Sequence, residues 1–174
     1  MNDKTKKLVT AAIVGALYAV LTMALAPISY GPLQFRISEA LCILPFFVPY
    51  TAWGLFFGCV VANLISAAGV LDVVFGSLAS LIACLAVAAF GRKGTALKNR
   101  ILACLMPVLV NGVIVGAVLC YAFTDLAPWN NFLAFLVYAG QVALGELGVM
   151  LVVGLPIMSW LPKQKFFSEY LLKH

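Results

Sequence analysis

The stretch Phe132–Leu161, FLAFLVYAGQVALGELGVMLVVGLPIMSWL, contains a single charged residue, Glu146. About 20 consecutive apolar residues are enough to cross a bilayer as a helix, so the stretch predicts a membrane span. A carboxylate in mid-bilayer costs about 2.5–3.5 kcal/mol on insertion scales, and no basic residue in the same span neutralises this one. Gly145 and Gly148 beside it let a ligand or another backbone approach closely. We therefore predict that Glu146 belongs to a functional site inside the membrane.

The rest of the chain has the same apolar character. Its 174 residues are 64% hydrophobic and 10% charged, where a soluble domain has about 25% charged residues. The sequence predicts a single all-α integral membrane domain over residues 1–174, and it lacks the alternation of a β-barrel. Six apolar spans can be read: Leu8–Ala26, Ile37–Pro49, Ala52–Ala68, Leu71–Phe90, Ile101–Phe123 and Phe132–Leu161. The second span is short, and Pro45 interrupts it.

The basic residues predict the orientation of these transmembrane helices. All but one of the 11 Lys and Arg residues lie before the first span, between the fourth and fifth spans, or after the sixth. Because cytoplasmic connections are rich in Lys and Arg, both the N- and C-termini are predicted to be cytoplasmic, in a bacterial plasma membrane. Arg36 is the exception and falls on the outer side. This bias explains the net charge of +5 without nucleic-acid binding.

The few polar residues of the spans outline a cavity. At about 1.5 Å per residue, Glu146 lies about 22 Å and Asn111 about 20 Å below the outer ends of their helices, and Asn63 about 8 Å below its own. Glu39 and Asp72 lie near the outer ends of the second and fourth spans. Together these residues predict a polar cavity that opens to the outside and ends near mid-membrane.

Most of these polar residues also have a purely structural interpretation. Arg36 and Glu39 have the i,i+3 spacing of a local ion pair. Asp72 is equally compatible with capping the fourth span. Asn63 and Asn111 are compatible with hydrogen bonds between helices. The sequence leaves these alternatives open.

No catalytic motif is present. The sequence has no internal His, no HExxH, no GxSxG and no P-loop. Hydrolysis of ATP by a P-loop is therefore excluded, and no other catalytic set is visible. The five cysteines are scattered and suit packing positions within the spans. We predict binding or permeation rather than enzymatic activity, without a cofactor or a metal.

Small residues form stripes on three of the spans. In the first span they include Ala12, Gly15 and Ala16. In lipid such a face lets another helix approach closely, either within this chain or from a partner protein. In the third and fourth spans we predict internal seams: Gly54, Gly58 and Ala62, and Gly76, Ser80 and Cys84.

Four segments, in this order, carry a resemblance to a known family. They are YGPLQFRISEAL at Tyr30–Leu41, GVLDVVFGSLA at Gly69–Ala79, PVLVNG at Pro107–Gly112, and the pair Gly145–Glu146. The chain resembles the QueT family of predicted queuosine-precursor transporters along nearly its whole length. These are substrate-binding (S) components of energy-coupling factor (ECF) transporters. The resemblance implies an S-component-like bundle of six transmembrane helices with both ends in the cytoplasm.

The resemblance also implies partners and a lid. S components work with a transmembrane T component and two cytoplasmic ATPase subunits. The face that carries Ala12 and Ala16, with Gly15 beside them, is implied to dock on the T component. The outer connection Pro27–Phe35 is implied to act as a lid over the substrate.

The implied ligand is a 7-deazaguanine such as 7-aminomethyl-7-deazaguanine. Its N1–H and exocyclic amine are donors, its aminomethyl group is cationic, and its O6 accepts. From this chemistry we assign Glu146 to the base edge and Glu39 or Asp72 to the ammonium group. Asn111 or Asn63 would donate to O6.

The flat ring of such a ligand needs an aromatic platform, for which Phe35, Phe75 and Tyr121 are available. Two alternatives remain: another vitamin or nucleobase bound by the same scaffold, and a standalone carrier that uses Glu146 as a proton relay. The predicted substrate-binding residues are Glu146, Asn111, Glu39, Asp72, Asn63, Arg36, Gln34 and Phe35.

Overall fold

The computed structural model describes residues 2–31, 33–165 and 167, and every regular element within them is a helix. In chain order the elements are α1 (Asp3–Ala24), α2 (Ala26–Ser29), η1 (Ile37–Phe46), α3 (Thr51–Asn63), η2 (Asp72–Gly76), α4 (Ser77–Arg92), α5 (Leu97–Thr124), α6 (Phe132–Val149), η3 (Met150–Gly154), α7 (Leu155–Trp160) and η4 (Leu161–Lys163). η1 and η4 are 3₁₀-helices, and η2 and η3 are π-helical. For these residues the prediction of an all-α chain is confirmed.

Four helical segments are long and apolar enough to cross a membrane: Asp3–Ala24, Asp72–Arg92, Leu97–Thr124 and Phe132–Lys163. The chain is a membrane protein on this ground. η1 has 10 residues and α3 has 13, so both are shorter than the roughly 20 residues of a full α-helical span. Because a 3₁₀-helix rises about 2.0 Å per residue and an α-helix about 1.5 Å, each of the two is about 20 Å long.

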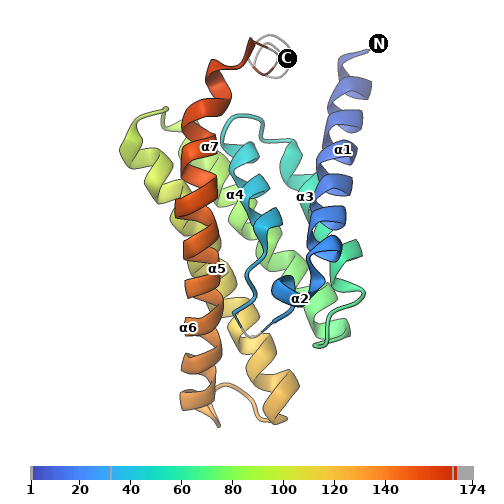
Figure 1. The fold of residues 1–174 in the computed structure, drawn as a ribbon, viewed down its shortest axis with the longest axis vertical. Helices are drawn as coiled ribbons and strands as arrows, with labels where there is room; N and C mark the ends of the chain where they lie inside the picture. Colours follow the sequence, from blue (N-terminus) through green and yellow to red (C-terminus); the bar gives the residue numbers. More distant parts are fainter. Residues whose placement is uncertain (1, 32, 166, 168–174) are drawn as a thin grey trace.

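The connections gather at two ends of the bundle (Figure 1). The start of α1, the end of η4 and the connection between α4 and α5 lie at one end. The connections from α2 to η1, from α3 to η2 and from α5 to α6 lie toward the opposite end. Lys and Arg residues flank the connections of the first end, whereas Arg36 belongs to the second. We call the second end the outer end, after the orientation that the basic residues predict.

Glycines bring α1 and α3 into backbone contact. A Cβ atom at Gly15 would collide with the Gly54 carbonyl oxygen, and one at Gly54 would collide with the carbonyl oxygen of Ala11. A Cβ atom at Gly58 would meet the Gly15 carbonyl oxygen. Both predicted internal seams are buried, which confirms that part of the sequence analysis.

Candidate functional site

Five of the predicted site residues line one small cavity inside the bundle. They are Gln34, Arg36, Glu39, Asn111 and Glu146, and each is at most 7% exposed. The cavity has a volume of about 10 Å³, which is room for about one water molecule. We call it the inner cavity. The sequence therefore identified residues from three helices and one connection that the fold brings together.

Glu146 and Asn111 contact each other across the inner cavity. The Asn111 amide nitrogen donates a hydrogen bond to Glu146 Oε1. Glu146 Oε2 and Asn111 Oδ1 are buried and have no hydrogen-bond partner. Buried polar atoms in native proteins are nearly always hydrogen-bonded, so two unpaired acceptors on one hydrogen-bonded pair of residues indicate a place for a donor-bearing ligand or water.

Glu39, unlike Glu146, accepts a hydrogen bond on each of its carboxylate oxygens. Tyr18 Oη donates to its Oε1, and Cys42 Sγ donates to its Oε2 at 3.0 Å. Sequence reasoning did not single out Tyr18. The spacing of Tyr18 could have indicated its burial, because it lies three residues after Gly15 and four before Thr22, on the same buried face of α1. Both oxygens of Glu39 are thus fixed by the protein, whereas Glu146 keeps one free.

Arg36 forms its ion pair with Asp72 and not with Glu39. Its Nη2 lies 3.2 Å from Asp72 Oδ2, and its Nε donates to the Ser29 carbonyl oxygen at 3.3 Å. Ser66 Oγ donates to the same Asp72 oxygen at 2.6 Å. The local Arg36–Glu39 pair and the capping role of Asp72 are therefore wrong, because Asp72 is turned toward another connection. The pair links the connection before η1 to the start of η2.

Asn63 stabilises that second connection from the end of α3. Its amide nitrogen donates to the Asp72 carbonyl oxygen at 2.9 Å and approaches Ser77 Oγ at 3.4 Å. Asn63 is fully buried and does not line the inner cavity. These contacts fit the interpretation as a hydrogen bond between helices.

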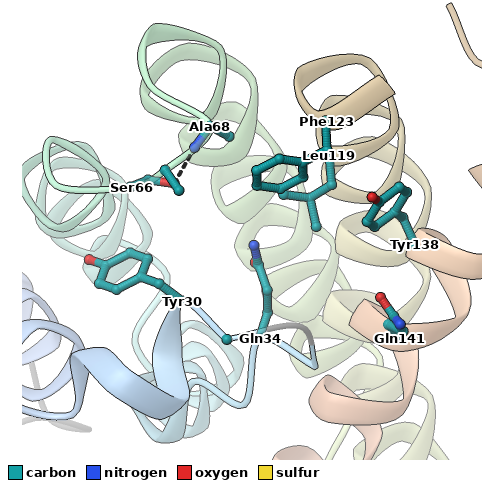
Figure 2. A pocket seen from close by; sticks show the side chains of 10 residues that line it. Tyr30, Gln34, Ser66, Ala68, Leu119, Phe123, Tyr138 and Gln141 are labelled. Atoms are coloured by element: carbon teal, nitrogen blue, oxygen red, sulfur yellow. Dashed lines mark hydrogen bonds between the residues drawn. The ribbon is translucent and has the colours of Figure 1, made fainter. Parts of the chain in front are cut away.

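A larger cavity of about 380 Å³ lies on the outer side, and Figure 2 shows its walls. Tyr30 stands on one side of it, and Phe123, Tyr138 and Gln141 stand on the other. Gln34 lines this outer cavity as well as the inner one, and its side chain extends between the two walls. Its backbone has φ +45°, a left-handed conformation that is uncommon outside glycine. Gln34 therefore separates the two cavities.

The connection that carries Gln34 is fastened to α6. A Cβ atom at Gly145 would collide with the Leu33 carbonyl oxygen, and one at Gly148 would lie 3.2 Å from the Phe35 ring. Within the predicted lid segment Pro27–Phe35, Pro32 lies outside the described residues. The glycines beside Glu146 thus make room for this connection, which covers the inner cavity.

Tyr30 belongs to the same connection. Its hydroxyl donates to the Ala62 carbonyl oxygen, and the Arg36 guanidinium lies 5.3 Å from the centre of its ring. Burial raises the pKa of Tyr30, while the charge of Arg36 opposes the shift. The neutral phenol remains a donor and ties the connection to α3.

None of the three predicted stacking residues lines the inner or the outer cavity. Phe75 and Tyr121 are about half exposed and line a separate apolar groove with Trp129. Phe35 is half-buried and contacts α6 near Gly148 rather than lining either cavity. The aromatic residues at the outer cavity are instead Tyr30, Phe123 and Tyr138, which the sequence did not distinguish from other aromatic residues of the spans.

The small-residue stripe of α1 has two faces with different environments. Gly15 is buried against α3, where its backbone contacts Gly54 and Gly58. Ala12 and Ala16 are exposed and line a shallow apolar groove between α1 and α3 of about 560 Å³. Gly15 therefore serves internal packing, and the accessible part of the stripe is the Ala12–Ala16 face.

Comparison with known proteins agrees with the resemblance seen in the sequence. The model of the QueT transporter family matches residues 8–163. A relative named Queuosine precursor transporter QueT, from Lactococcus lactis subsp. cremoris (strain MG1363), is 45% identical over 83 residues. That match covers 47% of this chain and 48% of the relative, so it spans about half the length of each. No solved structure matches the chain. Because the family model covers almost all of it, the chain belongs to the QueT transporter family.

Proposed function

We propose that this chain is the membrane-embedded subunit that captures a queuosine precursor for uptake. Membership of the QueT transporter family supports transport, and the name of the relative supports the substrate class. The ligand is a 7-deazaguanine such as 7-aminomethyl-7-deazaguanine. The chain acts in a bacterial plasma membrane as the S component of an ECF transporter, and it is not an enzyme.

The observation that carries this proposal is the charge around the inner cavity. Two carboxylates, Glu39 and Glu146, line it. Arg36 is the basic residue among its lining residues, and Arg36 is already paired with Asp72. Buried charges need a partner, so the cavity favours a ligand that brings a positive charge and hydrogen-bond donors. An aminomethyl-deazaguanine brings both.

The structure supports a choice among the roles open to the polar residues. Glu39 takes the ammonium group, because it lines the inner cavity, whereas Asp72 does not line it and its charge is already paired with Arg36. Glu146 takes the base edge. The amide nitrogens of Asn111 and Asn63 already donate to protein atoms, so the amide of Gln34 is the donor proposed for O6.

The outer cavity is the proposed entry site. Its volume of about 380 Å³ falls within the roughly 300–1,000 Å³ of small-molecule sites. Tyr30, Phe123 and Tyr138 offer aromatic surface for a flat ring. To reach Glu146 the ligand must displace Gln34, which places the lid movement in the connection before η1.

Topology and partners complete the proposal. Six spans with both termini in the cytoplasm fit the basic residues near one end of the bundle. η1 and α3 are then short spans of about 20 Å. A T component docks on the exposed Ala12–Ala16 face, and two ATPase subunits supply the energy, since the sequence contains no P-loop.

The proposed substrate can be tested by comparing the affinities of the purified chain for two ligands. We expect 7-aminomethyl-7-deazaguanine to bind more tightly than 7-methyl-7-deazaguanine, which lacks the amine. Glu39→Gln should remove most of this preference, about tenfold or more, because a charge-assisted hydrogen bond is lost. Glu146→Gln should weaken both ligands. Asp125→Asn, in an exposed loop, is the control and should change neither affinity. Unchanged preference in Glu39→Gln would contradict the assignment.

Co-purification tests the partners. Ala16→Leu adds bulk to the exposed face of α1 and should abolish capture of a co-expressed T component and its ATPases. Ala89→Leu makes the same change at an exposed position of α4 and should leave capture intact.

Transport by the chain alone is a separate test. Vesicles that contain only this chain should not accumulate ligand under a pH gradient; uptake there would favour a proton-coupled carrier instead.

A further inference from the structure

Glu146 and Asn111 are hydrogen-bonded to each other, and each keeps one unpaired acceptor oxygen. Both residues are nearly fully buried, at 4% and 3% exposure, and both line the inner cavity. The hydrogen bond from the Asn111 amide nitrogen to Glu146 Oε1 holds the two side chains together. The atoms left over are Glu146 Oε2 and Asn111 Oδ1, one from α6 and one from α5.

The chemistry of the pair fixes which atoms remain free. A carboxylate only accepts, so Asn111 must present its amide nitrogen to Glu146 and turn its oxygen away. Glu39, the other carboxylate of the cavity, has a donor on each oxygen. The hydrogen-bonded pair of Glu146 and Asn111 thus provides two unpaired acceptors among the residues that line the inner cavity. The volume of the inner cavity, about 10 Å³, admits about one water molecule, whose two hydrogens suit these acceptors.

We infer that Glu146 Oε2 and Asn111 Oδ1 together select a ligand edge with two neighbouring donors, and so require the 2-amino group of the base. This inference rests on the proposed function and adds to it. The N1–H and the 2-amino group of a 7-deazaguanine are adjacent donors, one for each oxygen. The ligand replaces the water and its hydrogen bonds. A base without the 2-amino group leaves one buried acceptor unpaired, and sites built around a hydrogen bond reject such analogues strongly.

The test compares two ligands that differ only in this group. The full-length chain in detergent is titrated calorimetrically with 7-aminomethyl-7-deazaguanine and with 7-aminomethyl-7-deazahypoxanthine. We expect the second to bind about 10- to 100-fold more weakly. Asn111→Leu should reduce this ratio to about threefold or less, since it removes one acceptor. Thr51→Val is the control: Thr51 is a buried polar residue that lies off the inner cavity, so the ratio should persist.

The possible results distinguish a failure of this inference from a failure of the proposed function. Equal binding of the two ligands by the parent chain overturns the inference and leaves the proposed function standing. Binding of neither ligand overturns both. A ratio that survives in Asn111→Leu shows that another group reads the 2-amino position and also overturns the inference. Because each ratio is measured within one variant, a loss of stability affects both ligands alike, and the parent comparison decides even if a variant does not fold.

Discussion

At the residue scale, Gly145 allows the connection that carries Gln34 to pack closely beside Glu146. It precedes Glu146 in α6 and lies against the backbone of the connection that carries Gln34. A Cβ atom there would collide with the Leu33 carbonyl oxygen, whereas a Cβ atom at Gly140 of the same helix would meet no heavy atom within 4 Å. Substitution of the two glycines thus distinguishes crowding against the connection that carries Gln34 from an effect on helix propensity.

We expect Gly145→Ala to destabilise the protein by about 1–3 kcal/mol, because one added carbon forces the backbone of the connection outward. Gly140→Ala should be neutral or stabilise by up to about 1 kcal/mol through helix propensity. Thermal unfolding of both variants in the same detergent measures the difference. Similar behaviour of the two variants would show that the connection is not fastened at Gly145.

At the element scale, the ion pair between Arg36 and Asp72 joins two connections of the outer end. Arg36 precedes η1 and Asp72 begins η2, and the two side chains are 6% and 0% exposed. Ser29 and Ser66 add hydrogen bonds from either side. The starts of η1 and η2 are therefore coupled through charge and not only through apolar packing.

Removing one charge of this ion pair should lower the stability of the protein substantially. We expect Asp72→Asn to lower stability by roughly 3–5 kcal/mol, because the Arg36 guanidinium is left buried without its counter-ion. The double variant Arg36→Met/Asp72→Leu should lose less stability than the sum of the losses in the single variants Arg36→Met and Asp72→Leu. Chemical unfolding in detergent gives the values, with Asp125→Asn in the exposed loop as a control within about 0.5 kcal/mol of the parent. Additive losses in the double variant would disprove the coupling.

At the scale of the whole molecule, the polar site is built from parts of the chain that are far apart. Tyr18 comes from α1, Glu39 from η1, Ser80 from α4, Asn111 from α5 and Glu146 from α6. Each of these helices contributes one or two buried polar groups, and α1, α4, α5 and α6 expose large apolar side chains on their outward faces. In a membrane this arrangement keeps the charged groups away from lipid.

The proposed orientation makes a prediction for the whole chain. Thr95, in the connection between α4 and α5, should be cytoplasmic, and Asn130, in the connection between α5 and α6, should be outside. A membrane-impermeant maleimide should label Asn130→Cys in intact cells and Thr95→Cys only after permeabilisation. The five native cysteines are buried, so the parent chain serves as a low-background control. The reverse labelling pattern would require the opposite orientation.

Much of the site was predictable because polar residues are rare in apolar spans. Glu146 and Asn111 were recognisable as a pair at similar depth, and the structure brings them into contact. Glu39 and Arg36 were recognisable as site residues, but their partners were not, since the hydrogen bonds of Glu39 and the ion pair of Arg36 reach other parts of the chain. The aromatic residues were the least predictable, because every apolar span contains some and only packing decides which face a cavity.

The sequence by itself determined that this chain is an all-helical membrane protein with a deep carboxylate, because hydropathy and the cost of a charge in lipid act locally along the chain. Its motifs also identified the QueT transporter family. Only the tertiary structure decided that Asp72 neutralises Arg36, that Gln34 separates two cavities, and that Glu146 keeps one oxygen free. These features depend on distances between residues that are far apart in the sequence, and such distances are set by how the helices pack.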